Sequence, residues 1–415
     1  MTTKLRLLSS LLILMALTVA GQADSTKTIN MSSQSAEIFA KDSTVRQENS
    51  PTDITSDRGL YILTKDGNMQ LRILGSVRFS VLYDFVDLPV KNAFNTYYIP
   101  IGDERKGVPS FNSTLGQSRI GFEVTRKVKD QNVFVRLETD FAGVNDAYRI
   151  RHAYGQMGRF LVGQTWSLFS NVSSLPATVD PNGPTGSVTL RTPQIRYSGT
   201  TKKGDRWAVA LEYSQPDLDN QELDTVGLST VQVVPDFTAR IERAGYLGAV
   251  QLSLVASTLS LIDTEDNVSY KFGIGGSLSG SIDFSKDHKL LYQITYGQSI
   301  SRFITTFSGT GKDAIYNPAT GDFDALSSFG GFLSYGKDWK EDLVSNFSVG
   351  YADLSNRSYE PDTNYNESMS ISVDTFWEII DGARLGVEYA WGRRWNLDGR
   401  GGNASRLWAL FYYDF

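Results

Sequence analysis

Cysteine is absent from this 415-residue chain, and histidine and proline are scarce, with 2 and 12 residues. Without cysteine there is no disulfide and no paired Cys/His spacing for a metal site, so no covalent staple holds the fold. After the first twenty residues, no apolar run approaches the roughly 18 residues that a membrane-spanning helix needs. The formal charge of −6 is mild and indicates neither a nucleic-acid partner nor an anionic surface.

The first residues predict an exported protein. Lys4 and Arg6 precede an apolar run over 7–20, and Gly21-Gln22-Ala23 offers a cleavage site of small residues. This layout is typical of a secretory signal peptide over residues 1–23, and its apolar run is too short to span a bilayer. A retained anchor helix is the alternative interpretation.

Glycine and aromatic residues are abundant, with 37 Gly, 22 Phe, 20 Tyr and 7 Trp, which suits many strands and turns. In LRILGSVRFSVLYDF (71–85), one alternating face is free of charged side chains, and the other carries Arg72, Arg78 and Asp84. Sixteen segments with this alternation are expected, at 71–85, 118–126, 132–141, 147–155, 159–166, 191–198, 206–213, 237–243, 246–256, 270–282, 288–298, 327–335, 342–351, 367–378, 383–391 and 405–415.

The connections between these segments mostly alternate between short turns and long loops, such as 86–117, 257–269, 299–326 and 392–404. Short turns at one end, long loops at the other, an even strand number and an outward apolar band are typical of an outer-membrane β-barrel. We therefore expect an all-β fold. It would be a transmembrane antiparallel barrel of about 16 strands over 67–415, with short periplasmic turns, long extracellular loops, and a polar periplasmic leader over 24–66.

The chain ends in LWALFYYDF, in which every odd-numbered residue is apolar. We expect 405–415 to close the barrel by pairing with 71–85, with Tyr413 and Phe415 in the aromatic girdle. A terminal Phe415 also resembles the signal by which bacterial outer-membrane proteins engage their assembly machinery. A buried last strand of a soluble β protein is the alternative.

A barrel of about sixteen strands leaves an aqueous lumen, so passive transport is the expected function. Residue alternation places more arginines than carboxylates on the inner face of an acidic chain. The inward arginines are Arg72, Arg78, Arg119, Arg136, Arg149, Arg151, Arg196, Arg206, Arg240 and Arg384, beside Glu123, Glu138, Asp140, Glu212, Glu242 and Glu388. Arginine stays ionised and binds carboxylates through a planar fork of donors, which favours anions. The alternative is that these arginines only pair with the carboxylates of a wet wall.

The connection over 167–190 is rich in turn formers, including Pro176, Pro181 and Pro184. It is longer than a tight hairpin requires, and we expect it to fold into the lumen and form a constriction. A loop that lies over the outer rim is the alternative.

Several stretches together resemble the DcaP-type outer-membrane porins. They are TDFAG (139–143), RIRHAYGQMGRFLVGQTWSLF (149–169), VDPNGPTG (179–186), RTPQIRYS (191–198), QSRIGFEV (117–124) and VPDFTARIE (234–242). The resemblance implies a homotrimer of sixteen-stranded barrels that take up small anionic solutes such as dicarboxylates. It also implies a constriction at Arg149, Arg151, Arg191 and Arg196. Residues 24–60 lack the coiled-coil heptads expected for this family, which leaves a coiled-coil trimer tether without support.

An outer-membrane enzyme of the phospholipase type is the alternative function, since alternation places His152 on the lipid-facing side or at a trimer contact. No serine with an orienting partner accompanies it, so we expect no catalytic residue. A plugged receptor would need about 22 strands and a folded plug. The acidic stretch 217–224 could hold calcium, although a solvated loop is the simpler interpretation. We expect no cofactor and no metal.

The expected location is the bacterial outer membrane. The expected partners are outer-membrane lipid and lipopolysaccharide, two further copies of the chain, small anionic solutes, and the assembly machinery at Phe415.

Overall fold

The computed structural model describes residues 50–415 except 55–57, 103–107, 130 and 144–146, and the side chains of 220–222 are also outside the description. All described residues belong to one compact unit, Thr44–Phe415. The predicted signal peptide and most of the predicted leader lie outside the described residues.

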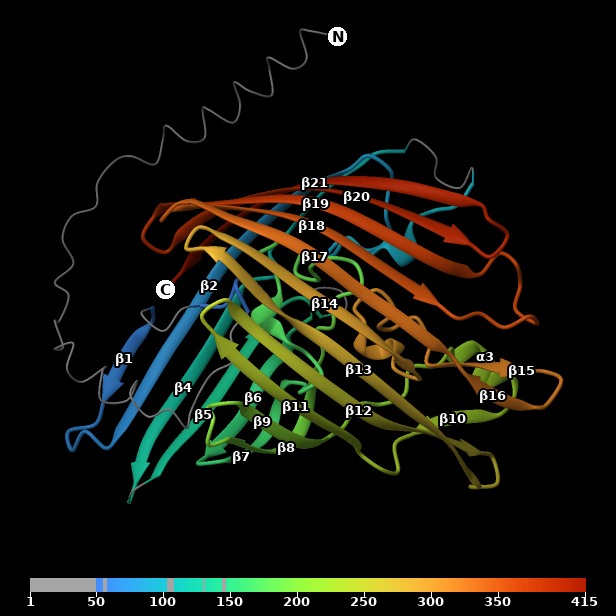
Figure 1. Ribbon diagram of the computed structural model, residues 1–415, viewed down its shortest axis with the longest axis horizontal. Helices are drawn as coiled ribbons and strands as arrows, with labels where there is room; N and C mark the ends of the chain where they lie inside the picture. The colour runs from blue at the N-terminus through green and yellow to red at the C-terminus, as the bar shows by residue number, and fades with distance from the viewer. Residues whose placement is uncertain (1–49, 55–57, 103–107, 130, 144–146) are drawn as a thin grey trace, which may run out of the picture. The chain divides into compact units, whose positions relative to one another are not determined.

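Sixteen antiparallel strands form a closed barrel (Figure 1), as the sequence predicted. They are β2 (Met69–Asp84), β4 (Arg119–Val128), β5 (Gln131–Asp140), β6 (Arg149–Met157), β7 (Phe160–Trp166), β8 (Arg191–Thr200), β9 (Arg206–Glu212), β11 (Asp236–Gly245), β12 (Gly248–Asp263), β13 (Val268–Ser285), β14 (His288–Gln298), β17 (Ser327–Lys340), β18 (Leu343–Leu354), β19 (Tyr365–Ile380), β20 (Ala383–Asn396) and β21 (Gly401–Asp414). Each strand pairs with its neighbours in this order, and β21 pairs with β2, which confirms the predicted closing pair.

Shorter elements lie in the connections before and between the barrel strands. They are β1 (Leu60–Leu63), β3 (Ser110–Thr114), β10 (Leu228–Val231), the hairpin of β15 (Ala314–Asn317) and β16 (Asp322–Ala325), α3 (Asn220–Thr225), and the single turns η1 (Thr96–Tyr98), η3 (Val172–Ser174) and η4 (Ser301–Phe303). Among the described residues, no helix is both long enough and apolar enough to cross a membrane.

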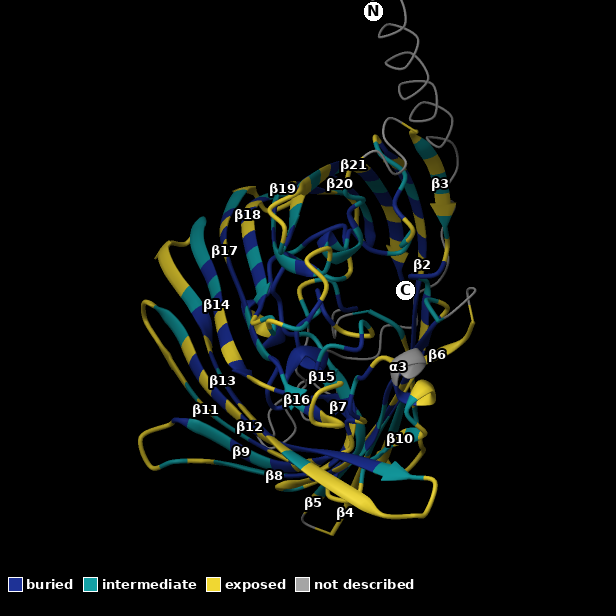
Figure 2. Ribbon diagram, turned by 90° about the vertical axis from the view of Figure 1, so that its right-hand side faces the viewer, coloured by how far each residue is buried: buried dark blue, intermediate teal, exposed yellow. Residues whose placement is uncertain are grey.

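Exposed apolar residues alternate with buried residues along the barrel strands (Figure 2). On β2, the outward Val77 and Phe79 are exposed, whereas the inward Arg78 and Ser80 are buried. Since successive side chains of a strand point to opposite faces, one sequence builds an apolar outer wall and a polar inner wall.

Two loops that were predicted as long are in fact strand pairs. Strands β12 and β13 continue beyond the predicted ends, and Leu261 pairs with Ser269. Here the inward residues Leu259 and Leu261 are apolar because they pack on Leu218 and Phe323, which come from other loops. The stretch 392–404 likewise belongs mostly to β20 and β21, with only 397–400 between them.

Candidate functional site

The inner face of β2, β4, β5, β6 and β8 carries a group of arginines that we call the arginine wall. Its members are the eight predicted pore residues Arg72, Arg78, Arg119, Arg136, Arg149, Arg151, Arg191 and Arg196. On β4 to β8, six of these arginines share the inner face with three carboxylates, Glu123, Glu138 and Asp140. The described wall is therefore rich in positive charge.

One end of the wall is held together by Glu123. Arg72 Nη1 lies 2.9 Å from Glu123 Oε2, and Arg136 Nε lies 3.6 Å from Glu123 Oε1. Arg136 also forms a salt bridge with Glu138. These side chains come from three adjacent strands, so the ion pairs also fix the inner rotamers of the sheet.

The centre of the wall is a network around Glu138 and Asp140. Arg151 Nε lies 2.9 Å from Glu138 Oε1, and its Nη1 lies 3.0 Å from Asp140 Oδ2. Arg149 binds the same Asp140 at 2.7 Å and is 47 % exposed, whereas Arg151 is 8 % exposed. Arg149 therefore presents donors to the solvent while its partner carboxylate orients it.

Arg191 and Arg196 are held by a tryptophan at the end of β7. The guanidinium carbon of Arg191 lies 3.5 Å from the centre of the Trp166 ring, a cation–π contact. Arg196 donates to the Trp166 carbonyl oxygen and, at 2.9 Å, to Gln194 Oε1. Arg119 and Arg151 are electrostatic neighbours of Arg191, so β8 belongs to the same positive region.

Arg78 completes the wall on β2 and is 1 % exposed. Its Nη2 lies 3.8 Å from Asp414 Oδ1, and its guanidinium lies 4.8 Å from the Tyr412 ring centre. Three other inward arginines of the sequence are not members of the wall, although Arg384 donates to Tyr412 Oη at 3.3 Å. Arg206 pairs with Glu242 and Arg384 with Glu378, and Arg240 is on β11.

A β-bulge in β6 changes which residues face inwards. Glu138 pairs with His152, while the next residue, Thr139, pairs with Ile150, so Arg151 is the extra residue. His152 is consequently 1 % exposed, and its Nδ1 lies 3.0 Å from Thr165 Oγ1. The prediction that His152 faces lipid or a trimer contact is wrong, and the phospholipase alternative loses its lipid-facing histidine.

The loop over 167–190, which we call loop 3, runs along the inner surface of the opposite wall. Its backbone amides bind inward side chains of successive strands: Val188 N binds Gln293 Oε1 on β14 at 2.9 Å, and Thr185 N binds Ser370 Oγ on β19 at 3.3 Å. Thr185 lies directly on Gly350 of β18 and Gly186 on Gly330 of β17, and a side chain added at either strand glycine would collide with the loop. Because these glycines have no side chain, the backbone of loop 3 can pack directly against the two strands.

A group of three carboxyl residues anchors the middle of loop 3. Asp180 N donates to Glu388 Oε2 at 2.7 Å, and Val179 N donates to Asp374 Oδ1 at 3.1 Å. The side chains of Asp374 and Glu388, which are cross-strand partners, share a hydrogen bond. Burial, together with the nearby Glu388 carboxylate, raises the pKa of Asp180 to about 8. The protonated form of Asp180 is thus favoured at neutral pH.

Segments of two further connections enter the barrel, which the sequence did not predict: residues 88–99 of the connection after β2, called loop 1, and residues 299–326, called loop 6. In loop 6, Ile300, Phe303, Ile304 and Phe307 are at most 1 % exposed and pack against Phe169 and Val188 of loop 3. Their i, i+3, i+4, i+7 spacing is a helical pattern of apolar residues, and this was the signal in the sequence that loop 6 does not remain in solvent.

Loop 1 joins the same assembly. Thr96 Oγ1 lies 3.2 Å from Thr185 Oγ1 of loop 3 and 2.8 Å from Ser368 Oγ of β19. Asn95 Nδ2 donates to the Thr306 carbonyl oxygen of loop 6 at 3.1 Å. Loops 1, 3 and 6 therefore bind each other, and loops 1 and 3 also bind the barrel strands opposite the arginine wall. Figure 2 shows segments of the chain inside the ring of strands.

A short piece of the predicted leader also lies against the arginine wall. Asp53 Oδ1 is 2.7 Å from Arg119 Nη1 and 3.6 Å from Arg151 Nη2, and the Asp53 side chain is 1 % exposed. The Thr52 carbonyl oxygen accepts from Arg78 Nη2 at 2.7 Å. Burial by itself would raise the pKa of Asp53. The positive charges of Arg119 and Arg151 act in the opposite direction and outweigh burial, so the pKa is lowered to about 2. Nothing in the polar composition of this segment pointed to such a contact.

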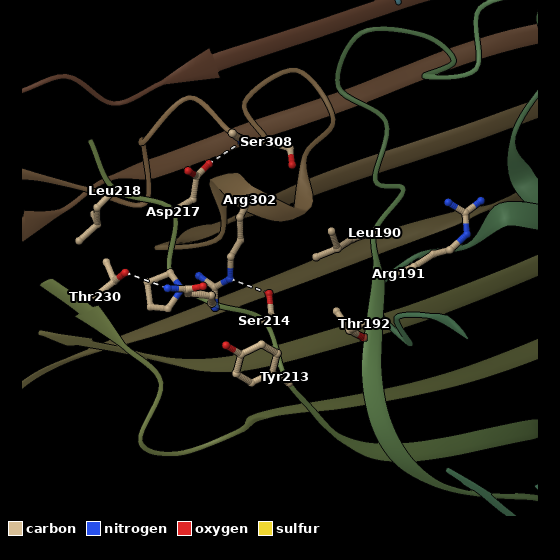
Figure 3. Close-up of a pocket in the computed structure, with 13 residues that line it drawn as sticks. Leu190, Arg191, Thr192, Tyr213, Ser214, Asp217, Leu218, Thr230, Arg302 and Ser308 are labelled. Atoms are coloured by element: carbon tan, nitrogen blue, oxygen red, sulfur yellow. Dashed lines mark hydrogen bonds between the residues drawn. The ribbon is translucent and has the colours of Figure 1, made fainter. Parts of the chain in front are cut away.

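A polar cavity of ≈ 420 Å³ opens between loops 3 and 6 and the connection after β9 (Figure 3). In it Arg302 Nε donates to Ser214 Oγ at 2.9 Å, and the guanidinium of Arg191 points away from the cavity. Asp217, the first residue of the acidic stretch 217–224, accepts a hydrogen bond from Gly309 N at 2.7 Å. Within the described part of the chain, no grouping of acidic, histidine or cysteine side chains could hold a metal ion.

Chemically, the arginine wall is a row of fixed guanidinium charges on the inner face, of which Arg149, with a side chain 47 % exposed, is the most accessible to solvent. Arginines held by carboxylates, a tryptophan ring and carbonyl groups keep their remaining donors in set directions. The inward loops occupy part of the barrel interior on the side opposite the arginine wall.

The family model described as "DcaP outer membrane protein" matches residues 52–415. A search of curated proteins found no match. Among solved structures, the outer membrane channel DcaP of Acinetobacter baumannii is similar with a TM-score of 0.72 at 20 % identity, covering 85 % of this chain and 99 % of that one. An anion-selective porin from Comamonas acidovorans has a TM-score of 0.55 at 12 % identity, with 84 % and 100 % covered. The trimer form of OmpT, an outer membrane protein of Vibrio cholerae, has 0.52 at 11 %, with 84 % and 100 % covered.

Proposed function

Because the chain belongs to the DcaP outer membrane protein family, we propose that it forms a water-filled pore for passive diffusion of small hydrophilic solutes. The preferred solutes are small anions, with dicarboxylates as the class that the family resemblance implies and that several neighbouring guanidinium groups can bind. The single observation that carries this proposal is the arginine wall, in which six arginines of β4 to β8 face three carboxylates. Rings or rows of arginine lower the energy of an anion in a pore and raise that of a cation.

The solute path runs beside the arginine wall, opposite loop 3. The acidic residues Asp374 and Glu388 bind the backbone of loop 3, so the loop covers these carboxylates and separates them from the arginines. An anion that crosses the barrel therefore meets guanidinium groups on one side and a neutral, hydrogen-bonded loop on the other.

We further propose that three copies assemble in the outer membrane, each with its own pore, surrounded by lipid and lipopolysaccharide. The support is the likeness in fold to a porin that forms trimers. Export through the predicted signal peptide over 1–23 and recognition of Phe415 by the assembly machinery belong to the same proposal. Native mass spectrometry of the detergent-extracted protein gives the number of copies, and a monomeric mass would contradict the trimer.

The test of the pore is a planar-bilayer recording under a salt gradient. We expect stepwise conductance and a reversal potential of the sign for anion preference. Replacing Arg149, Arg151 and Arg196 by glutamine should lower the anion-to-cation permeability ratio about fivefold, which corresponds to about 1 kcal/mol. Arg206→Gln is the matched control, since Arg206 lies outside the arginine wall. A cation preference of the natural chain, or no effect of the triple substitution, would reject the proposal.

A further inference from the structure

The arginine wall already holds a carboxylate that does not belong to the barrel. Asp53 comes from the segment that precedes β1, and its Oδ1 lies 2.7 Å from Arg119 Nη1 and 3.6 Å from Arg151 Nη2. Both arginines are at most 8 % exposed, so this contact is made in the interior of the barrel. The distances are those of a charge-assisted hydrogen bond and of a second, longer ion pair.

The segment around Asp53 is held by the same arginines through its backbone. The Thr52 carbonyl oxygen accepts from Arg78 Nη2 at 2.7 Å and from Arg119 Nη1 at 3.4 Å. Ser50 N donates to Asp53 Oδ2 at 2.7 Å, which folds the segment into a turn and presents Oδ1 to the wall. A carbonyl oxygen and a carboxylate thus occupy three guanidinium groups on β2, β4 and β6.

This arrangement has the chemistry of a bound ligand. A permeating carboxylate needs ionised donors with fixed directions, and Arg119 and Arg151 provide them to Asp53. The wall's own carboxylates approach these arginines from β5: Glu138 and Asp140 lie 2.9 and 3.0 Å from Arg151, and Glu138 Oε1 lies 3.8 Å from Arg119 Nη1, farther than Asp53 does. Asp53 belongs to the segment before β1 and not to a barrel strand. Its contact with the arginine wall can therefore break while every pairing between barrel strands is kept.

We propose that Asp53 is an internal substitute for the carboxylate of a solute, and that it competes with anions for Arg119 and Arg151. The inference rests on the proposed function of the pore. Asp53 is then a residue that determines specificity: it raises the solute concentration needed to fill the site and reduces the positive charge that a passing ion meets. A dicarboxylate, which brings two charges, displaces it more readily than a monovalent anion does.

The experiment compares the natural chain with Asp53→Asn in planar bilayers, using succinate as the probe. We expect the succinate concentration that half-blocks the chloride current to fall about tenfold in Asp53→Asn. This factor corresponds to the lower end of the coupling energies measured for close charge pairs. The chloride-to-potassium permeability ratio should rise in the same variant. Asp53→Ala must give the same result, and Asp53→Glu, which keeps the charge, must stay near the natural chain.

Asp66→Asn is the matched control, because Asp66 is an exposed carboxylate of the same leader that binds Thr64 and Asn68 instead of the wall. Equal changes in Asp53→Asn and Asp66→Asn would show a general charge effect and overturn the proposal. Unchanged succinate block in Asp53→Asn, with an anion-selective natural chain, would overturn it while the proposed function stands. A cation-selective natural chain would instead reject the proposed function itself.

Discussion

The ring of Phe415 lies on the backbone of Gly75, and the two residues exchange backbone hydrogen bonds of 2.9 Å in both directions. A methyl group built on Gly75 would overlap the ring. The first and last barrel strands are therefore joined by an aromatic side chain that covers a glycine on the outer wall, where the aromatic ring shields the exposed backbone.

Gly75→Ala should weaken the closure of the barrel. The new methyl group forces the Phe415 ring out of its position, and overpacking of this kind costs about 1–3 kcal/mol. Urea unfolding in detergent, followed by the shift in electrophoretic mobility between folded and unfolded chains, measures the effect. Gly276→Ala is the control, since its nearest neighbour is Leu254 Cδ2 at 3.7 Å. Equal midpoints for the two variants would contradict the prediction.

Phe415→Ala tests the other partner of this contact. The variant removes the ring but leaves the backbone pairing with Gly75, so we expect a barrel that still refolds in detergent. In cells, the amount in the outer membrane should fall, because the terminal aromatic residue is the proposed recognition element for assembly. Quantitative immunoblots of membrane fractions measure this, with Phe411→Ala as the matched control on the same strand. Normal assembly of Phe415→Ala would refute that role.

The seat of loop 3 gives a prediction about conductance. At Gly350, an added Cβ would lie 2.7 Å from Thr185 N and 3.0 Å from its carbonyl carbon. Gly350→Ala must therefore push loop 3 away from β18 and towards the arginine wall. We expect a smaller single-channel conductance as a result. Gly155→Ala, whose nearest contact is at 3.9 Å, should conduct like the natural chain. An unchanged conductance in Gly350→Ala would show that loop 3 does not limit the current.

The carboxyl group of Asp180 predicts a dependence of stability on pH. Its pKa is raised from 3.8 to about 8 by burial and by Glu388, so the folded chain keeps a proton that the unfolded chain loses. Stability should then fall as the pH rises from about 4 through about 8. We expect the thermal unfolding midpoint of Asp180→Asn to depend less on pH than that of the natural chain, and to exceed it at pH 9.

The control for this experiment is Asp398→Asn, because Asp398 is a carboxylate in a surface turn that binds Arg400 at 2.6 Å. Its substitution should leave the pH slope between 4 and 8 as it is. If Asp180→Asn retained the full slope, the proton would have to reside on another group of the cluster.

The barrel could be predicted from sequence because alternation is a local property of each strand. Every second residue of β2 faces lipid, and the same rule placed Arg119, Arg136 and Arg196 on the inner face. The rule failed at His152, since a single extra residue in β6 reverses the alternation and no residue type marks it. The rule was not applied to Leu259 and Leu261, because 257–269 was expected to be a loop; in β12 they are apolar and inward because distant loops cover them.

The interior of the barrel was harder to predict because its contacts join segments far apart in the sequence. Loop 3 was expected inside from its length and turn residues, but its partners Gly350, Asp374 and Glu388 lie 165 or more residues further along the chain. The contact between Asp53 and Arg119 spans 66 residues, and no periodic pattern encodes it. Such contacts depend on the finished ring, which a local pattern cannot describe.

Because β2 is hydrogen-bonded to β21, the barrel cannot close before the residues of β21 have been synthesised. A chain that stops before β21 would leave two strand edges unpaired. Lipid offers no hydrogen-bond partners for the N–H and C=O groups of those edges. Such a truncated chain lacks the closed hydrogen-bonded ring that a lipid bilayer requires of a spanning sheet.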